Sequence, residues 1–156
     1  MQAGEITFLL DSMLGRLGKW LRVMGFDTHY QPVYISGEID RLHTGGRLLL
    51  SRNRTIVKSR RPALLINADQ IRGQLYEIKN KGYLPVLKEK WFSRCLLCNI
   101  LLADVTTEDI CEDIPEYVLS DTSGIRHCPQ CKRYFWKGSH RKRMLNQIDE
   151  WKLFSF

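Results

Sequence analysis

Two Cys-x-x-Cys pairs, Cys95/Cys98 and Cys128/Cys131, constrain the last third of this 156-residue chain more than any other feature. Each pair places two thiolates on one tight turn, and four thiolates complete the tetrahedral shell of a structural zinc ion without leaving a position for substrate. Redox use is the alternative, but redox Cys-x-x-Cys motifs normally occur singly, between a strand and a helix. The sequence therefore predicts a zinc ribbon, and any chemistry is expected elsewhere. The fifth cysteine, Cys111, is interpreted as a small buried hydrophobe.

Length and composition set the class of protein. With 156 residues, the chain can hold one ordinary domain and a small appendage, and a content of 44% hydrophobic and 26% charged residues is typical of a globular protein. No apolar run reaches the roughly 18 residues that a membrane span needs, and no signal-peptide pattern opens the chain. Cysteines arranged for metal binding fit a reducing compartment. We therefore expect a cytoplasmic protein that does not enter the membrane.

Strand and helix patterns alternate over the first half of the chain, which predicts an α/β fold with a parallel sheet flanked by helices. Ser12 is expected to cap the first helix, Gly25 to end it, and Ser139 to cap a C-terminal helix. The predicted domains are an α/β domain over 1–90 and a zinc ribbon with a C-terminal helix over 91–156. The predicted strands cover 6–10, 26–30, 47–51 and 63–67, and the predicted helices cover 13–24, 38–44, 54–60 and 69–81.

Polar side chains follow several of these predicted strands. The carboxyl ends of parallel strands are where functional groups gather, and convergent carboxylates there can hold Mg²⁺ or Mn²⁺ for phosphodiester cleavage. Taken alone, Asp69 is more simply interpreted as a helix cap, and Glu38 and Asp40 as solvated helix charges. Asp11 is the exception, since the serine that follows it makes it redundant as a cap. The candidate catalytic residues are Asp11, Glu38, Asp40, Asn53 and Asp69.

A net charge of +7 suggests a polyanionic partner, and the cations are clustered. One cluster lies over 52–61 and a second over 132–143, where aromatic residues alternate with cations as base stacking and phosphate neutralisation require. A ribbon whose aromatics pack its own small core is the other interpretation, and both stay open at this point. The predicted RNA-binding residues are Arg16, Arg52, Arg54, Lys132, Arg133, Tyr134, Trp136, Lys137, His140 and Arg143.

Five motifs together resemble one family over nearly the whole chain. The first runs from Phe8-Leu9-Leu10-Asp11-Ser12 to Arg22, and the second is Gly46-Arg47-Leu48-Leu49-Leu50-Ser51-Arg52-Asn53. The others are Ser93-Arg94-Cys95-Leu96-Leu97-Cys98-Asn99, the run Cys128-Pro129-Gln130-Cys131 with Lys132 to Trp136, and Gly138-Ser139-His140 with Arg143-Met144. The chain resembles the PIN-like ribonuclease domain named after the C-terminal part of the Mut-seven exoribonucleases.

The resemblance implies a PIN-like α/β domain followed by a zinc ribbon, with Mg²⁺- or Mn²⁺-dependent cleavage of RNA. Asp11 matches the first metal-binding acid, and Asp69 matches a recurrent acid. Either Glu38 or Asp40 fits the acid of the intervening helix. Asn53 departs from the pattern, because the family usually ends this strand in Thr-Arg-Asp and an amide brings no negative charge and cannot act as a base.

The resemblance leaves two functions open. One is a metal-dependent ribonuclease, and the other is a non-catalytic RNA-binding protein that kept the fold with a weakened metal site. PIN-like domains often pair, so a homodimer is compatible with the resemblance, whereas no residue supports association with a ribosome. His140 is interpreted as a first-turn residue of the last helix, since four cysteines already complete a zinc shell.

Overall fold

The computed structural model describes residues 5–105, 114, 116 and 124–154, so Cys111 lies outside the described residues. The chain divides into two units, residues 1–99 and residues 100–156. The first Cys-x-x-Cys pair falls in the first unit and the second pair in the second unit. Each unit is described by itself below.

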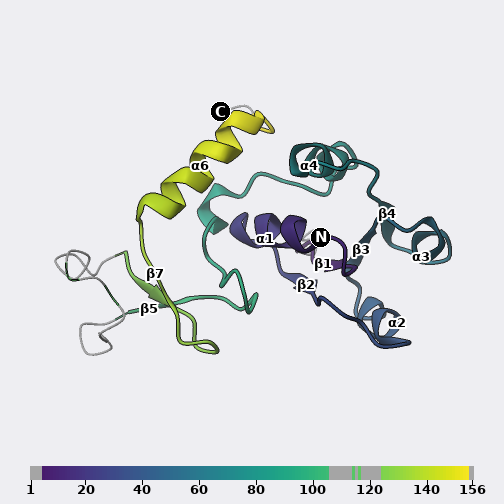
Figure 1. Ribbon diagram of the computed structural model, residues 1–156, viewed down its shortest axis with the longest axis horizontal. Helices are drawn as coiled ribbons and strands as arrows, with labels where there is room; N and C mark the ends of the chain where they lie inside the picture. Colours follow the sequence, from purple (N-terminus) through teal and green to yellow (C-terminus); the bar gives the residue numbers. More distant parts are fainter. Residues whose placement is uncertain (1–4, 106–113, 115, 117–123, 155–156) are drawn as a thin grey trace. The chain divides into compact units, whose positions relative to one another are not determined.

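The first unit is built on a four-stranded parallel sheet in the order β2-β1-β3-β4 (Figure 1). The strands are β1 (Phe8–Leu10), β2 (Thr28–Tyr30), β3 (Leu48–Ser51) and β4 (Ala63–Leu65). Strands β1 and β3 are buried along their whole length, as expected for central strands covered on both faces. The predicted parallel α/β sheet is therefore confirmed, and its register aligns Leu10 with both Tyr30 and Leu50.

Helices connect the strands and cover the sheet. They are α1 (Gly15–Val23), α2 (Glu38–His43), α3 (Arg54–Lys58) and α4 (Ile71–Asn80), followed by a short 3-10 turn, η1 (Lys88–Lys90). Helix α1 packs on β2 and α4, and its buried Leu17 and Leu21 join Leu75 and Ile78 of α4 in the core. Gly25 follows α1 with a φ of 89°, the left-handed conformation that glycine was expected to supply there.

Two predicted helix caps are wrong. The N-cap of α1 is Leu14, because the chain first makes a turn in which Leu14 N donates to Asp11 O at 3.2 Å. Ser12 therefore lies outside the helix, and Asp11 takes part in the turn that precedes it. In the last helix, α6 (Ser139–Trp151), the N-cap is Gly138 and Ser139 is already helical. His140 consequently lies in the first turn, as predicted.

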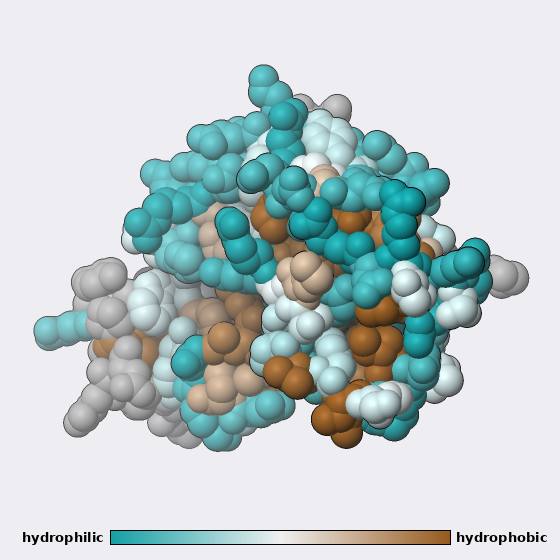
Figure 2. All heavy atoms as spheres, turned by 45° about the vertical axis from the view of Figure 1, so that its right-hand side comes forward, coloured by the Kyte–Doolittle hydropathy of each residue, from teal (hydrophilic) through white to brown (hydrophobic). Residues whose placement is uncertain are grey.

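The second unit contains a three-stranded antiparallel sheet and α6. The strands are β5 (Ala103–Asp104), β6 (Arg126–His127) and β7 (Tyr134–Phe135), paired in that order. Met144 and Ile148 form the buried face of α6. Among the described residues, no helix has the length and apolar character needed to cross a membrane. Figure 2 shows a face on which hydrophilic side chains predominate and hydrophobic ones form separate patches.

Candidate functional site

Asp11 directly follows β1 at the carboxyl edge of the sheet and is only 5% exposed. Its position is set by the backbone, since Asp11 N donates to Leu50 O of β3 at 3.1 Å. The Met13 amide donates to Asp11 Oδ1 at 2.9 Å, and the Ser51 hydroxyl donates to Asp11 Oδ2. A carboxylate offers about four acceptor positions, so two hydrogen bonds orient Asp11 and leave room for a cation.

Tyr34 fixes the loop after β2 against the end of β1. Its hydroxyl donates to Leu10 O at 2.6 Å and accepts from the Gln31 amide at 3.1 Å. Burial raises the pKa of Tyr34 to about 12, and the charges of Asp11 and Glu38 act in the same direction. Tyr34 therefore stays a neutral donor at physiological pH, and it lies within the electrostatic reach of both carboxylates.

The two acids of α2 have different partners. Glu38 accepts from the Ile35 amide at 3.1 Å and from Gln31 Nε2 at 3.2 Å, and these bonds lower the pKa of Glu38. Asp40 binds Arg60 through both oxygens, at 2.7 and 3.2 Å, and this bond lowers the pKa of Asp40. Arg41 Nη2 also lies 3.8 Å from Glu38 Oε1, beyond hydrogen-bond distance. Glu38 is therefore connected mainly to the Gln31 and Tyr34 loop beside Asp11, whereas Asp40 is held by two hydrogen bonds from one arginine.

Asn53 is the N-cap of α3. Its side-chain Oδ1 accepts from the Thr55 amide at 2.9 Å and from the Ile56 amide at 3.4 Å. Its backbone N donates to Ser51 Oγ at 2.9 Å, so Asn53 reaches Asp11 only through that hydroxyl. Since the amide oxygen already accepts two hydrogen bonds, ligation of a metal by Asn53 would require the cap to open.

Asp69 is the most exposed of the candidate acids that form an ion pair. Its side chain is 81% exposed, and its Oδ1 lies 2.5 Å from Arg52 Nη2. Among the described residues, Cys95, Cys98, Cys128 and Cys131 form the only group of three or more acid, histidine or cysteine side chains spaced to hold a metal ion. The structure thus brings Asp11 close to Ser51, and it places an arginine within hydrogen-bond distance of Asp40 and of Asp69, and another 3.8 Å from Glu38.

Because Asn53 caps α3, two substitutions at this position should differ in their effect on stability. Asn53→Ala removes the acceptor for two helix amides and should lower the free energy of unfolding by about 1 kcal/mol, whereas Asn53→Asp keeps the cap and should change it little. Chemical denaturation measures both, with Ser59→Ala at the other end of α3 as the control. If Asn53→Ala were as stable as the wild type, the amide would not be acting as a cap.

The two Cys-x-x-Cys turns have the same local geometry. In each turn the second cysteine amide faces the first sulfur at 3.4 Å, and the next residue, Asn99 or Lys132, donates its amide to the first cysteine's carbonyl at 2.9 Å. Asn99 and Lys132 both have positive φ, 69° and 66°. The four Sγ atoms lie within 4.8 Å of one another. Since Zn–S bonds of about 2.3 Å place the sulfurs of a tetrahedral site about 3.8 Å apart, the donor set fits zinc.

The first of these turns is held to α1 and β2 by a buried arginine. Arg22 donates from Nη1 to Leu96 O and Leu97 O at 3.0 and 3.2 Å, and from Nε and Nη2 to Thr28 O at 3.0 and 2.9 Å. Asn99 adds two bonds, because its Oδ1 accepts from the Thr28 amide at 2.9 Å and its Nδ2 donates to Asp27 at 2.7 Å. Burial lowers the pKa of Arg22, and the nearby charges of Cys95 and Cys98 oppose that shift.

The predicted RNA-binding residues differ in exposure. The aromatic members are half-buried, and Tyr134 packs on His127 with ring centroids 4.9 Å apart. Arg52 is also half-buried. The exposed members are Arg16, Arg54, Lys132, Arg133, Lys137, His140 and Arg143. The aromatic residues of the second unit therefore pack in part within that unit, while most of the predicted RNA-binding cations face solvent.

Sequence reasoning missed Ser51 and Tyr34 as parts of the site. Ser51 could have been found, because parallel strands in register place the residue after Leu50 beside the residue after Leu10. Tyr34 carries no comparable signal, since it lies in an irregular loop between β2 and α2.

Comparison with known proteins gives one positive finding. The family model described as the Mut7-C RNAse domain matches residues 6–148. No curated protein and no solved structure matches the chain.

Proposed function

Since the chain belongs to the Mut7-C RNAse domain family, we propose that it is a metal-dependent ribonuclease with its acidic centre at Asp11. A nuclease or RNA-related function follows from the family, and the metal dependence and the residues are the proposal. In this proposal, zinc bound by the four cysteines has a structural role and takes no part in cleavage. Because those thiols must stay reduced to bind zinc, we place the protein in the cytoplasm.

The observation that carries the proposal is the setting of Asp11. A nearly buried carboxylate ends a central parallel strand, and hydrogen bonds from Met13 N and Ser51 Oγ hold it in one orientation. Ligands bind at this edge in open parallel sheets. The remaining acceptor positions of this carboxylate suit a hard cation.

Each residue of the proposed centre has a separate role. Asp11 supplies carboxylate oxygens, and Glu38 supplies the second carboxylate. Ser51 orients Asp11, while Tyr34 and Gln31 hold the loop that carries Glu38. When bound, Mg²⁺ or Mn²⁺ would act as a Lewis acid on the phosphodiester. Exposed cations such as Arg16 and Arg54 would bind the flanking phosphates.

The proposal distinguishes the two acids of α2. Glu38→Gln should lower the rate of RNA cleavage about 100-fold or more and weaken Mn²⁺ binding, because it removes one of the two carboxylates that are proposed to bind the metal directly. Asp40→Asn should leave the rate of cleavage and the affinity for Mn²⁺ within a few-fold of the wild-type values, because Asp40 pairs with Arg60. Initial cleavage rates and Mn²⁺ binding followed by electron paramagnetic resonance test this. Equal losses in the two variants, or a loss only in Asp40→Asn, would reject Glu38 as the second acid.

A non-catalytic RNA-binding protein is the second candidate. It is favoured by Asn53, which stands where the family usually has an acid and uses its amide oxygen as a helix cap. The two candidates differ in divalent-metal affinity at Asp11, which only the enzyme needs. RNA that binds in a gel shift and stays intact with Mn²⁺ present would favour the second candidate.

A further inference from the structure

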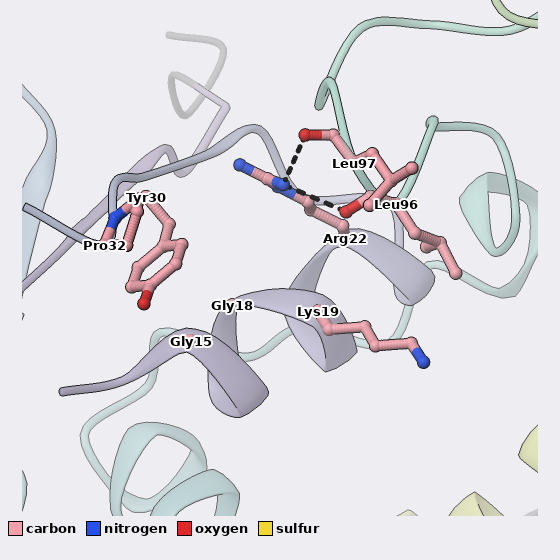
Figure 3. Close-up of a pocket in the computed structure, with 8 residues that line it drawn as sticks. All are labelled: Gly15, Gly18, Lys19, Arg22, Tyr30, Pro32, Leu96 and Leu97. Atoms are coloured by element: carbon pink, nitrogen blue, oxygen red, sulfur yellow. Dashed lines mark hydrogen bonds between the residues drawn. The ribbon is translucent and has the colours of Figure 1, made fainter. Parts of the chain in front are cut away.

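A pocket of about 410 Å³ opens beside α1 in the first unit (Figure 3). Its floor is the glycine face of α1, formed by Gly15 and Gly18. Tyr30 and Pro32 stand on one side, and Leu97 with its neighbour Leu96 stands on the other. This volume falls within the range of about 300–1,000 Å³ that is usual for pockets that bind small ligands.

Both walls of the pocket are fixed by hydrogen bonds within the unit. The Tyr30 hydroxyl donates to Ser12 O at 3.0 Å, and the ring lies so close to Gly15 that a Cβ there would be 2.8 Å from the hydroxyl oxygen. On the opposite side, Arg22 holds the carbonyls of Leu96 and Leu97. The hollow therefore exists before any ligand arrives, which keeps the cost of ordering it low.

The lining suits a flat, weakly polar group attached to an anion. The Tyr30 ring, the Pro32 ring and the Leu97 side chain offer apolar surface, and Leu97 is 57% exposed. Lys19 lies at the rim, with Arg16 one turn earlier on α1, and both are exposed. Within the described part of the chain, neither cation forms an ion pair. A nucleotide has this combination, because its base stacks on an aromatic ring and its phosphate attracts a cation.

The pocket lies next to the proposed acidic centre along the chain and in the sheet. Tyr30 is in register with Leu10, the residue before Asp11, and its hydroxyl binds the residue after Asp11. A strand of RNA with one base in the pocket would have its neighbouring phosphates near the carboxyl edge of β1. We propose that this pocket takes one unstacked base of the RNA, so that the substrate is single-stranded. This inference rests on the proposed function, from which it takes RNA as the ligand.

Binding of a single-stranded RNA that contains 2-aminopurine tests the pocket without cleavage. Asp11→Asn protein, loaded with zinc and free of added Mg²⁺ or Mn²⁺, should quench 2-aminopurine emission, and it should bind the single strand at least about tenfold more tightly than a duplex. Adding Tyr30→Leu should weaken single-strand binding by about tenfold or more and abolish the quenching. Tyr30→Phe keeps the ring but loses the hydrogen bond to Ser12 O, so it should keep the quenching and weaken binding by a few-fold at most. Lys19→Glu should weaken binding more than Lys81→Glu, a control on the end of α4.

Because Tyr30 also packs on Gly15, Leu97→Glu provides a second variant that places a charge in the opposite wall. Loss of quenching with Leu97→Glu in a folded protein supports the pocket. Wild-type affinity and quenching in both Tyr30→Leu and Leu97→Glu would overturn it, even if the protein cleaves RNA. Conversely, pocket-dependent binding by a protein that never cleaves RNA would support the pocket and reject the nuclease.

Discussion

Asp11→Asn should lower the rate of RNA cleavage about 100-fold or more, and its affinity for RNA should stay within a few-fold of the wild-type affinity. Changing a residue that only orients a metal ligand typically lowers metal affinity or activity about 10–100-fold. Loss of a direct ligand is therefore expected to lower activity by the upper end of that range or more. The amide can still accept from Met13 N, and it can donate to Ser51 Oγ in place of the lost hydrogen bond. We therefore expect the fold to survive while the charge that attracts the cation is lost.

Initial rates on a labelled RNA in Mn²⁺ measure this effect, and a gel shift without added metal measures binding. The matched control is Asp104→Asn, which removes one carboxylate from a side chain that is 94% exposed in the second unit. Cleavage by Asp11→Asn at the wild-type rate would remove Asp11 from the centre. A parallel loss of RNA binding would indicate that Asp11 contributes to structure and not specifically to catalysis.

Loss of zinc should have the second large effect, on stability. We expect one zinc ion per chain, and we expect Cys95→Ser to abolish its tight binding. Structural zinc contributes on the order of 10 kcal/mol or more to folding, which is comparable to the whole stability of a small domain. Cys95 begins the turn whose carbonyls bind Arg22, and Asn99 binds Asp27 and Thr28. The destabilisation should therefore reach α1 and β2 of the first unit.

Native mass spectrometry measures the zinc content, and hydrogen exchange of the amides in α1 and β2 measures how far the effect spreads. Cys111→Ser is the matched control, because Cys111 stands outside both Cys-x-x-Cys pairs. Unchanged exchange in β2 after zinc removal would show that the first turn holds its position without the metal. Full zinc content in Cys95→Ser would contradict the four-cysteine site.

The sequence predicts the sheet well because burial has a strong local pattern. Leu48-Leu49-Leu50 forms a continuous apolar run, and β3 is buried on both faces. The same reasoning places Asp11 at the end of β1. The two Cys-x-x-Cys pairs predict a metal-binding cluster, because the spacing itself shapes each turn.

The partners of polar side chains could not be predicted in this way. Asp40 and Arg60 are 20 residues apart, and only the fold brings the two side chains together. Asn53 illustrates a competition, since an amide after a strand can ligate a metal or cap the next helix, and here it caps α3. Ser12 fails as a cap because Asp11 accepts the Met13 amide and the helix begins later.

Cleavage of a labelled single-stranded RNA by the zinc-loaded protein, with Mn²⁺ or with no added divalent ion, tests the proposed ribonuclease most directly. A chelator is avoided, because it would also remove zinc from the cysteines. We expect labelled fragments with Mn²⁺ and intact RNA without it. RNA that stays intact in both conditions while it binds the protein would contradict the ribonuclease and establish an RNA-binding protein on the same fold.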